Sequence, residues 1–179
     1  MIYIVRHGQT NWNLLGKCQG WVDIELNETG LKQAEELAQK LAHVKFDICF
    51  ASPLKRAIKT AQTIYKGKIF VDDRIIERDN GELSGRTDWR EQGVDFNDPN
   101  ENRFNIETFP VLQRRLSSFW NEILTQYPHK NILVVTHAGT AMWSQVYFYG
   151  FPKDNDLSQY KLKNCEFLTI DDNIKPIGF

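Results

Sequence analysis

The sequence predicts an α/β fold, with three layers (α/β/α) around a mainly parallel central sheet. Short apolar, β-branched runs alternate along the chain with longer segments whose apolar residues recur at helical spacing. This alternation is typical of a parallel sheet covered by helices on both faces. The 179 residues show no internal repeat or linker and suit a single domain, 1–179, with a core of its own.

Five strands are expected, each from a short run of apolar residues. They cover residues 2–5, 47–51, 69–71, 131–136 and 166–170. Four helices are expected from apolar residues at helical spacing, over residues 31–41, 54–64, 111–127 and 141–149. Ser52-Pro53 before the second helix is read as an N-cap with proline in the first turn.

Residues 79–109 do not fit this alternation. They are polar, weakly periodic and too long for a simple connection. We therefore expect a lid or pocket wall here, with a mobile loop as the alternative. Arg86, Arg90 and Arg103 could bind a second anionic group of a ligand, or simply be solvated.

The composition indicates which kinds of partner and which cellular compartment to expect. The net charge of −1 and the pI of about 6.4 argue against nucleic acid or a membrane surface as the general partner, so an anion site must be a local cluster. Cys18, Cys49 and Cys165 form no CxxC pair and no metal-ligand pattern, and are expected to be reduced thiols. No apolar stretch has the length of a membrane span or signal peptide. The sequence thus predicts a cytoplasmic protein with no metal.

Reactive side chains follow three of the predicted strands directly. The first strand ends in Arg6-His7-Gly8, the second leads to Arg56 in the first turn of a helix, and the fourth ends in His137-Ala138-Gly139. Because the carboxyl ends of parallel strands meet at one sheet edge, two histidines, two arginines and helix N-termini are expected to converge. Such a cluster is an anion site, and phosphate is the obvious anion.

Ordered motifs over residues 2–140 extend this pattern. They read Arg6-His7-Gly8-Gln9-Thr10-Asn11-Trp12-Asn13, Ser52-Pro53-Leu54-Lys55-Arg56-Ala57, Ile76-Glu77 with Gly81-Glu82 and Gly85, and Val135-Thr136-His137-Ala138-Gly139-Thr140. The chain resembles the histidine phosphatase superfamily, which includes cofactor-dependent phosphoglycerate mutases and many small phosphatases. The resemblance implies the phosphoglycerate mutase-like fold and the small-phosphatase branch.

The resemblance also implies a role for each matching residue. His7 would attack phosphorus and carry the phosphoryl group, and Glu77 would be the general acid and then the base. The phosphate oxygens would be held by Arg6, Asn13, Arg56, His137 and Gly139. Asp79 is the second choice for the acid, because charged residues crowd together at this point. No metal and no cofactor are implied.

The same roles have independent chemical reasons. Neutral imidazole is a good nucleophile near neutral pH. Phosphoryl transfer needs mainly positioning and charge neutralisation, which arginine forks supply. An alkoxide leaving group also needs a proton donor. The expected activity is therefore metal-independent hydrolysis of phosphomonoesters of small metabolites through a phosphohistidine.

Two alternatives stay open at this point. One is phosphoglycerate mutase-type transfer, for which the chain is short. The other is a weakly catalytic regulatory module, although no core group is missing. Leu83-Ser84 departs from the usual pattern near the pocket wall, so the sequence does not identify the substrate. It also leaves the oligomeric state open, with a dimer as one option.

Overall fold

A computed structural model describes residues 1–96, 98, 100–154, 156–171 and 173–179. Its sheet has the strand order β3-β2-β4-β1-β5. The strands are β1 (Ile2–Arg6), β2 (Ile48–Ala51), β3 (Ile69–Val71), β4 (Ile132–Thr136) and β5 (Phe167–Ile170). β1 to β4 pair in parallel, and β5 runs antiparallel to β1. The expected mainly parallel sheet is confirmed.

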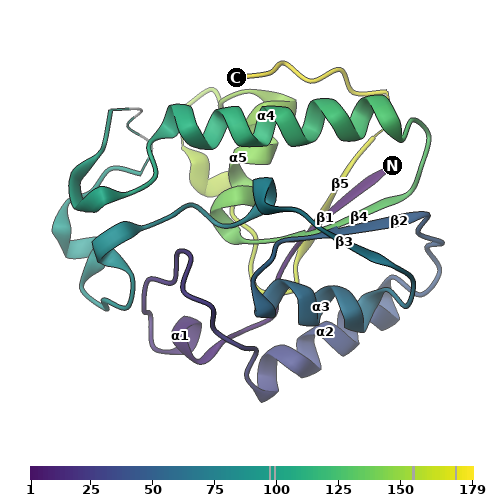
Figure 1. Cartoon of the computed structure of the whole chain (residues 1–179), viewed down its shortest axis with the longest axis horizontal. Coiled ribbons are helices and arrows are strands. Elements are labelled where there is room, and N and C mark those ends of the chain that lie inside the picture. Colours follow the sequence, from purple (N-terminus) through teal and green to yellow (C-terminus); the bar gives the residue numbers. More distant parts are fainter. Residues whose placement is uncertain (97, 99, 155, 172) are drawn as a thin grey trace.

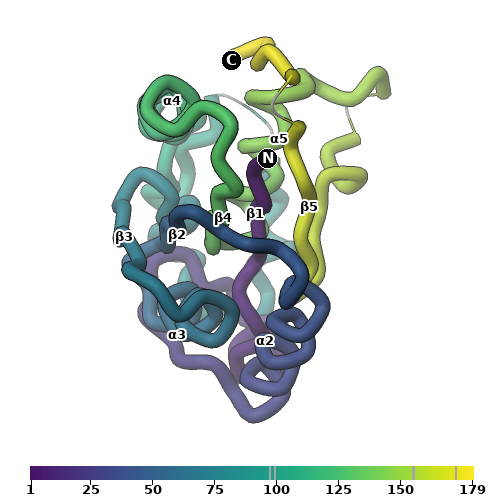
Figure 2. Tube along the Cα trace, turned by 90° about the vertical axis from the view of Figure 1, so that its right-hand side faces the viewer, coloured from purple at the N-terminus to yellow at the C-terminus, as the bar shows by residue number. Residues whose placement is uncertain are grey.

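Helices cover both faces of the sheet, as expected (Figures 1 and 2). α2 (Glu28–Lys40) and α3 (Lys55–Ile64) lie on one face. α4 (Phe109–Gln126) and α5 (Ala138–Tyr149) lie on the other. Because successive side chains of a strand point to opposite faces, β1 contributes Ile4 to the α4/α5 core and Val5 to the α2/α3 core.

Strand register brings the three reactive strand ends together. Arg6 at the end of β1 pairs with Thr136 at the end of β4, and β2 ends beside the same strand with Ala51 opposite Val135. One further backbone hydrogen bond follows the paired residues on each side of β4. His7 N donates to Thr136 O at 2.9 Å after β1, and Ser52 N donates to Val135 O at 3.0 Å after β2. The backbones that carry His7, Ser52 and His137 are therefore fixed by the sheet itself.

Several helix starts differ from the expected ones. Short α1 (Asn11–Leu14) was not expected; Thr10 caps it, accepting a hydrogen bond from the amide of Asn13. α2 and α5 begin three residues earlier than expected, and α4 two residues earlier. The expected N-cap at Ser52 is wrong: α3 begins at Lys55 after Leu54, without a side-chain cap.

The segment 79–109 is folded onto the rest of the domain where the structure describes it. It contains three short 3-10 turns, η2 (Gly81–Leu83), η3 (Trp89–Gln92) and η4 (Arg103–Asn105). Leu83 and Ile106 are buried with Cys18 in a small core. Trp89, Val94, Phe96 and Phe104 pack around that core. The segment is thus attached to the loop after α1 by apolar contacts.

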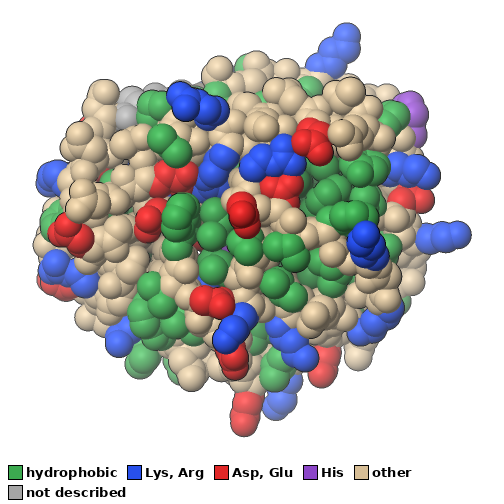
Figure 3. Space-filling model, in the orientation of Figure 1, with side chains coloured by type: hydrophobic (Ala, Val, Ile, Leu, Met, Phe, Trp, Pro, Cys, Tyr) green, Lys and Arg blue, Asp and Glu red, His purple; other side chains and the backbone are tan. Residues whose placement is uncertain are grey.

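Charges of both signs are interspersed on the surface seen in Figure 3, with hydrophobic side chains between them. That face has no large field of one sign that could attract an anion from a distance. Among the described residues, no helix has the length and apolarity needed to cross a bilayer.

Candidate active site

His7 lies at the bottom of the site and is 3% exposed. Its Nδ1 is 2.7 Å from the carbonyl oxygen of Gly8, which can only accept a hydrogen bond. In the neutral ring Nδ1 therefore carries the proton, and Nε2 keeps its lone pair. Burial lowers the pKa of His7 well below its usual value, and the positive charges of Arg56 and Arg6 lower it further. The imidazole is thus neutral at neutral pH, and the lone pair of Nε2 is not used by a hydrogen bond to Gly8.

His137 is completely buried beside His7, with ring centroids 5.0 Å apart. Its Nδ1 accepts a hydrogen bond from Arg56 Nε at 3.2 Å, so Nε2 carries the proton and donates to Ser52 Oγ at 2.7 Å. Burial and the charge of Arg56 lower the pKa of His137 well below its usual value. Both ring nitrogens are thus engaged within the protein. The Ser52 hydroxyl is a partner of this histidine rather than a helix cap.

Arg56, in the first turn of α3, is also completely buried. It donates from Nη1 to Val22 O at 2.7 Å and from Nη2 to Gly20 O at 2.9 Å. Burial lowers its pKa to about 10, so it stays positively charged at neutral pH. Two of its five N–H groups are left for a ligand.

Arg6 donates a hydrogen bond from Nη1 to Leu162 O at 2.8 Å. Neither Arg6 nor Arg56 is within ion-pair distance of a carboxylate in the described part of the chain. Two guanidinium groups without an ion-paired carboxylate, next to a neutral histidine, are chemically suited to a small dianion such as phosphate.

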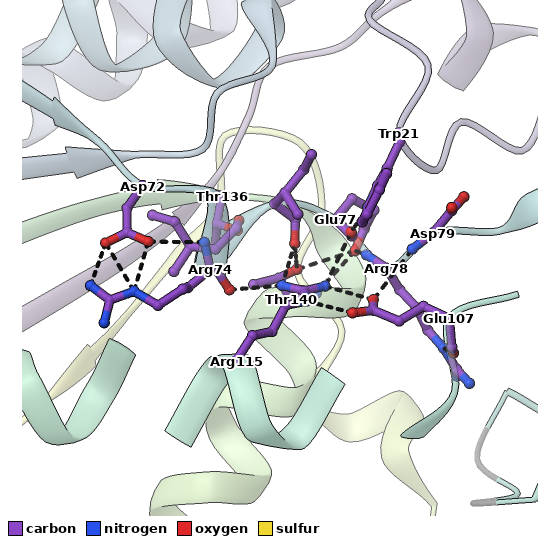
Figure 4. Close-up of polar contacts among 12 residues, drawn as sticks. Trp21, Asp72, Arg74, Glu77, Arg78, Asp79, Glu107, Arg115, Thr136 and Thr140 are labelled. Carbon is purple, nitrogen blue, oxygen red and sulfur yellow. Dashed lines mark hydrogen bonds and ion pairs between the residues drawn. The ribbon is translucent and has the colours of Figure 1, made fainter. Parts of the chain in front are cut away.

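Glu77 lies in the loop after η1 (Asp73–Ile75), and its carboxylate reaches the N-terminus of α5 (Figure 4). Oε2 accepts from the amide of Gly139 at 3.2 Å, and Oε1 accepts from the amides of Thr140 at 3.1 Å and Arg78 at 2.9 Å. Helix N-terminal amides favour a negative group, so they orient this carboxylate. The Asp79 carboxylate instead accepts from the amide of Gly81.

Asn13 presents its amide nitrogen to the site. Its Oδ1 accepts from the amide of Thr10 at 3.0 Å and from Asn164 Nδ2 at 3.2 Å. Asn164 also donates to the carbonyl of His7 at 3.0 Å. Because Oδ1 is occupied by donors, Nδ2 of Asn13 is the end that can donate to an anion.

A cavity of about 570 Å³ opens above these residues. Six of the seven residues expected at the site line it, namely Arg6, His7, Asn13, Arg56, Glu77 and Gly139. His137 does not line the cavity and lies behind it. Of the three arginines considered in residues 79–109, Arg90 lines it, whereas Arg86 and Arg103 pair with Asp88 and Glu101. Trp89 also lines the cavity.

Side chains outside the seven expected residues complete the site. Trp21 Nε1 donates to the carbonyl of Glu77 at 2.6 Å, and Arg115 on α4 donates to the same carbonyl at 3.1 Å. Trp143 on α5 and Leu157 and Lys161 after it line the far side of the cavity. No local pattern marks Arg115, Trp143, Leu157 and Lys161, because they reach the site only through the packing of α4, α5 and the segment after α5.

The sequence profile described as "Histidine phosphatase superfamily (branch 1)" matches residues 2–173 of the chain. The chain belongs to this superfamily. The site described above is therefore that of a histidine phosphatase superfamily member, and the expected family is confirmed.

Named phosphatases are among the similar proteins of this superfamily. The protein named "Uncharacterized phosphatase PhoE" of Bacillus subtilis is 39% identical over 139 residues, which cover 76% of this chain and 70% of that protein. Phosphoserine phosphatase 1 of Hydrogenobacter thermophilus is 33% identical over 147 residues, with coverages of 76% and 70%. A phosphoserine phosphatase of Entamoeba histolytica, solved as a mutant in complex with phosphoserine, superposes with a TM-score of 0.81 at 28% identity, covering 93% of this chain and 87% of that one.

The two buried histidines predict how the stability of this superfamily member depends on pH. Their pKa values are depressed in the folded protein, whereas in the unfolded chain they return to about 6.5. Below that pH the unfolded chain binds protons that the folded protein does not. The free energy of unfolding should therefore be highest above pH 6.5 and fall as the pH decreases, by up to about 1.4 kcal/mol per pH unit for each histidine.

Urea unfolding at several pH values between 7.0 and 5.5 measures how the free energy of unfolding changes with pH. Most carboxylates titrate below this range and contribute little to the change. His7→Ala should reduce the slope of free energy against pH by the contribution of one histidine, and His43→Ala, which removes an exposed histidine, is the matched control. Equal slopes in all three proteins would contradict the assignment of His7 as a buried neutral histidine.

Gly139 gives a second prediction, because a Cβ there would lie 2.6 Å from Glu77 Oε1. Gly139→Ala should push the carboxylate off the amides of α5. A roughly 10- to 100-fold lower kcat/KM for alkyl phosphates is the result expected if this carboxylate transfers protons. The displacement also takes the acceptor from the amides of Gly139 and Thr140, at up to about 1–3 kcal/mol each, so Tm should fall as well. Unchanged turnover at unchanged Tm would contradict this placement of Glu77.

Proposed function

We propose that this protein hydrolyses phosphomonoesters of small metabolites through a phosphohistidine on His7. One observation carries the proposal: the Nδ1 proton of His7 is held by the carbonyl of Gly8, which leaves the Nε2 lone pair beside the unpaired charges of Arg6 and Arg56. A neutral imidazole next to fixed positive charge is suited to attack a phosphate dianion.

The reaction then has two displacements. In the first, Glu77 starts in its protonated form: Nε2 of His7 forms a bond to phosphorus, the bond from phosphorus to the ester oxygen breaks, and Glu77 gives that oxygen its proton and becomes a carboxylate. In the second, Glu77 takes a proton from water, whose oxygen displaces His7 and yields inorganic phosphate. Arg6, Arg56 and Nδ2 of Asn13 hold the phosphate oxygens in both steps, and the guanidinium groups supply the positive charge.

His137 acts in this scheme through Arg56. Its Nδ1 accepts from Arg56 Nε, which orients the guanidinium, and its ring packs against His7. A direct contact between His137 and phosphate would require release of Ser52 or Arg56.

The proposed substrate class is a small phosphorylated metabolite. Two observations support it: the cavity of about 570 Å³ suits a small molecule, and the Entamoeba histolytica relative was solved with phosphoserine. Within residues 79–109, the side chains that line the cavity are Asn80, Trp89, Arg90 and Phe96. We infer that this segment acts as a pocket wall and selects the ester.

The cytoplasm is the proposed compartment. Cys18, Cys49 and Cys165 are free thiols, and burial raises the pKa of Cys49 to about 12. Unpaired, unreactive thiols are typical of proteins that function in a reducing environment.

The test is hydrolysis of an aryl phosphate in the presence of a metal chelator, combined with acid and alkali quenching of the enzyme during turnover. We expect turnover with chelator present and a phosphoenzyme that survives alkali but not acid. An absence of turnover would contradict the phosphatase and favour a regulatory module. Interconversion of phosphoglycerates that needs added 2,3-bisphosphoglycerate, without net phosphate release, would instead favour the mutase.

A further inference from the structure

The backbone that carries Glu77 is held by side chains rather than by a strand or helix. Glu77 lies between η1, which ends at Ile75, and η2, which begins at Gly81. Four successive carbonyls, of residues 74–77, nevertheless each accept a hydrogen bond from a side chain. The donors are Arg115 to residues 74, 76 and 77, Thr136 to residue 75, Thr140 to residue 76 and Trp21 to residue 77.

Arg115 makes the largest share of these contacts (Figure 4). Nη1 donates to the carbonyls of Arg74 at 2.7 Å and Ile76 at 2.8 Å, and Nη2 donates to that of Glu77 at 3.1 Å. Nε and Nη2 donate to the two carboxylate oxygens of Glu107 at 2.6 and 2.8 Å. All five N–H groups of the guanidinium are therefore used. A lysine ammonium has only three donors and no fork, so it cannot reproduce this arrangement.

Glu107 extends the same support to the other side of Glu77. Its backbone N–H donates to the carbonyl of Asp79 at 2.8 Å, and its carbonyl accepts from Arg78 Nε at 2.8 Å. The ion pair is largely buried, with 13% of the Arg115 side chain and 5% of the Glu107 side chain exposed. The pair thus forms hydrogen bonds to the backbone before and after Glu77. It also links this stretch of backbone to the segment 79–109, part of which lines the cavity.

We propose that the Arg115–Glu107 pair is a positioning device that sets the place of the Glu77 carboxylate relative to the leaving group. Neither residue lines the cavity, so the pair acts through the backbone of Glu77 and not by contact with substrate. A displacement of about 1 Å in a group of this kind can cost about 10²-fold in rate. The kinetic part of this inference rests on the function proposed above for Glu77.

A first test does not depend on activity. The amides of Gly139 and Thr140 donate to the Glu77 carboxylate, so their NMR resonances report its position. We expect Arg115→Lys and Glu107→Gln to shift both amide resonances. Arg114→Lys, at the exposed neighbouring position on α4, should leave them unchanged. Unchanged resonances in Arg115→Lys would overturn the inference, whatever reaction the protein catalyses.

A second test compares leaving groups. A misplaced proton donor slows the release of an alkoxide more than that of a nitrophenolate, which needs little protonation. In Arg115→Lys, the ratio of kcat/KM for an alkyl phosphate to that for p-nitrophenyl phosphate should fall at least about 10-fold, in the same direction as in Glu77→Gln. An equal loss for both substrates, in parallel with a lower Tm, would show a structural role only and overturn the proposal. If the wild type does not turn over either ester, the proposed function fails, and the NMR test still decides the positioning role.

Discussion

His7→Ala should lower kcat/KM for every phosphomonoester at least about 10³-fold, as is usual when the nucleophile of a covalent mechanism is removed. The loss should not depend on the leaving group, because no phosphoenzyme can form. The phosphate site should remain, since Arg6 and Arg56 are held by the carbonyls of Leu162, Val22 and Gly20 rather than by His7. Radiolabelled ester followed by quenching measures the phosphoenzyme, and calorimetry with inorganic phosphate measures binding.

The matched control is His43→Ala, which removes an exposed histidine and should have wild-type turnover. Phosphoenzyme that forms in His7→Ala with the wild-type rate would place the nucleophile elsewhere. Loss of phosphate binding together with turnover would instead indicate that the imidazole is part of the anion site rather than its nucleophile.

The matching motifs predicted seven site residues, but the topology of the sheet explains only those that follow a strand directly. His7 and His137 each follow a strand directly, and the pairing of Arg6 with Thr136 brings their backbones to the same edge. Because parallel strands all present their carboxyl ends to one edge, short local motifs were sufficient to predict that these groups converge.

Features that depend on side-chain contacts distant in sequence were not predictable in this way. Arg115 donates a hydrogen bond to the carbonyl of Glu77, which lies 38 residues earlier in the chain. Trp21 donates to the same carbonyl and lies 56 residues before it. Ser52 looked like a helix cap because its local sequence fits one, but its hydroxyl has a stronger partner in His137. Local sequence describes which bonds a side chain can make, whereas packing decides which of them it makes.

Arg56→Lys should have the second largest effect, on both stability and catalysis. The guanidinium is completely buried and donates to Val22 O, Gly20 O and His137 Nδ1. An ammonium can replace only part of this set, and each buried acceptor left without a donor costs about 1–3 kcal/mol. Loss of the fork also removes donors to the transferring phosphoryl group, so kcat/KM should fall about 10²- to 10³-fold.

Two measurements separate these contributions. A loss of about 2 kcal/mol should lower Tm by roughly 4–8 °C for a domain of this size. Inhibition by inorganic phosphate should weaken at temperatures where the variant is still folded, because an ammonium presents a single point charge where the guanidinium of Arg56 presents two donors in a fixed plane. Lys59→Met, at an exposed position of the same helix, should change neither quantity. If Arg56→Lys is less stable yet binds phosphate as tightly as the wild type, Arg56 supports the loop at Gly20 and Val22, and Arg6 with Asn13 holds the anion.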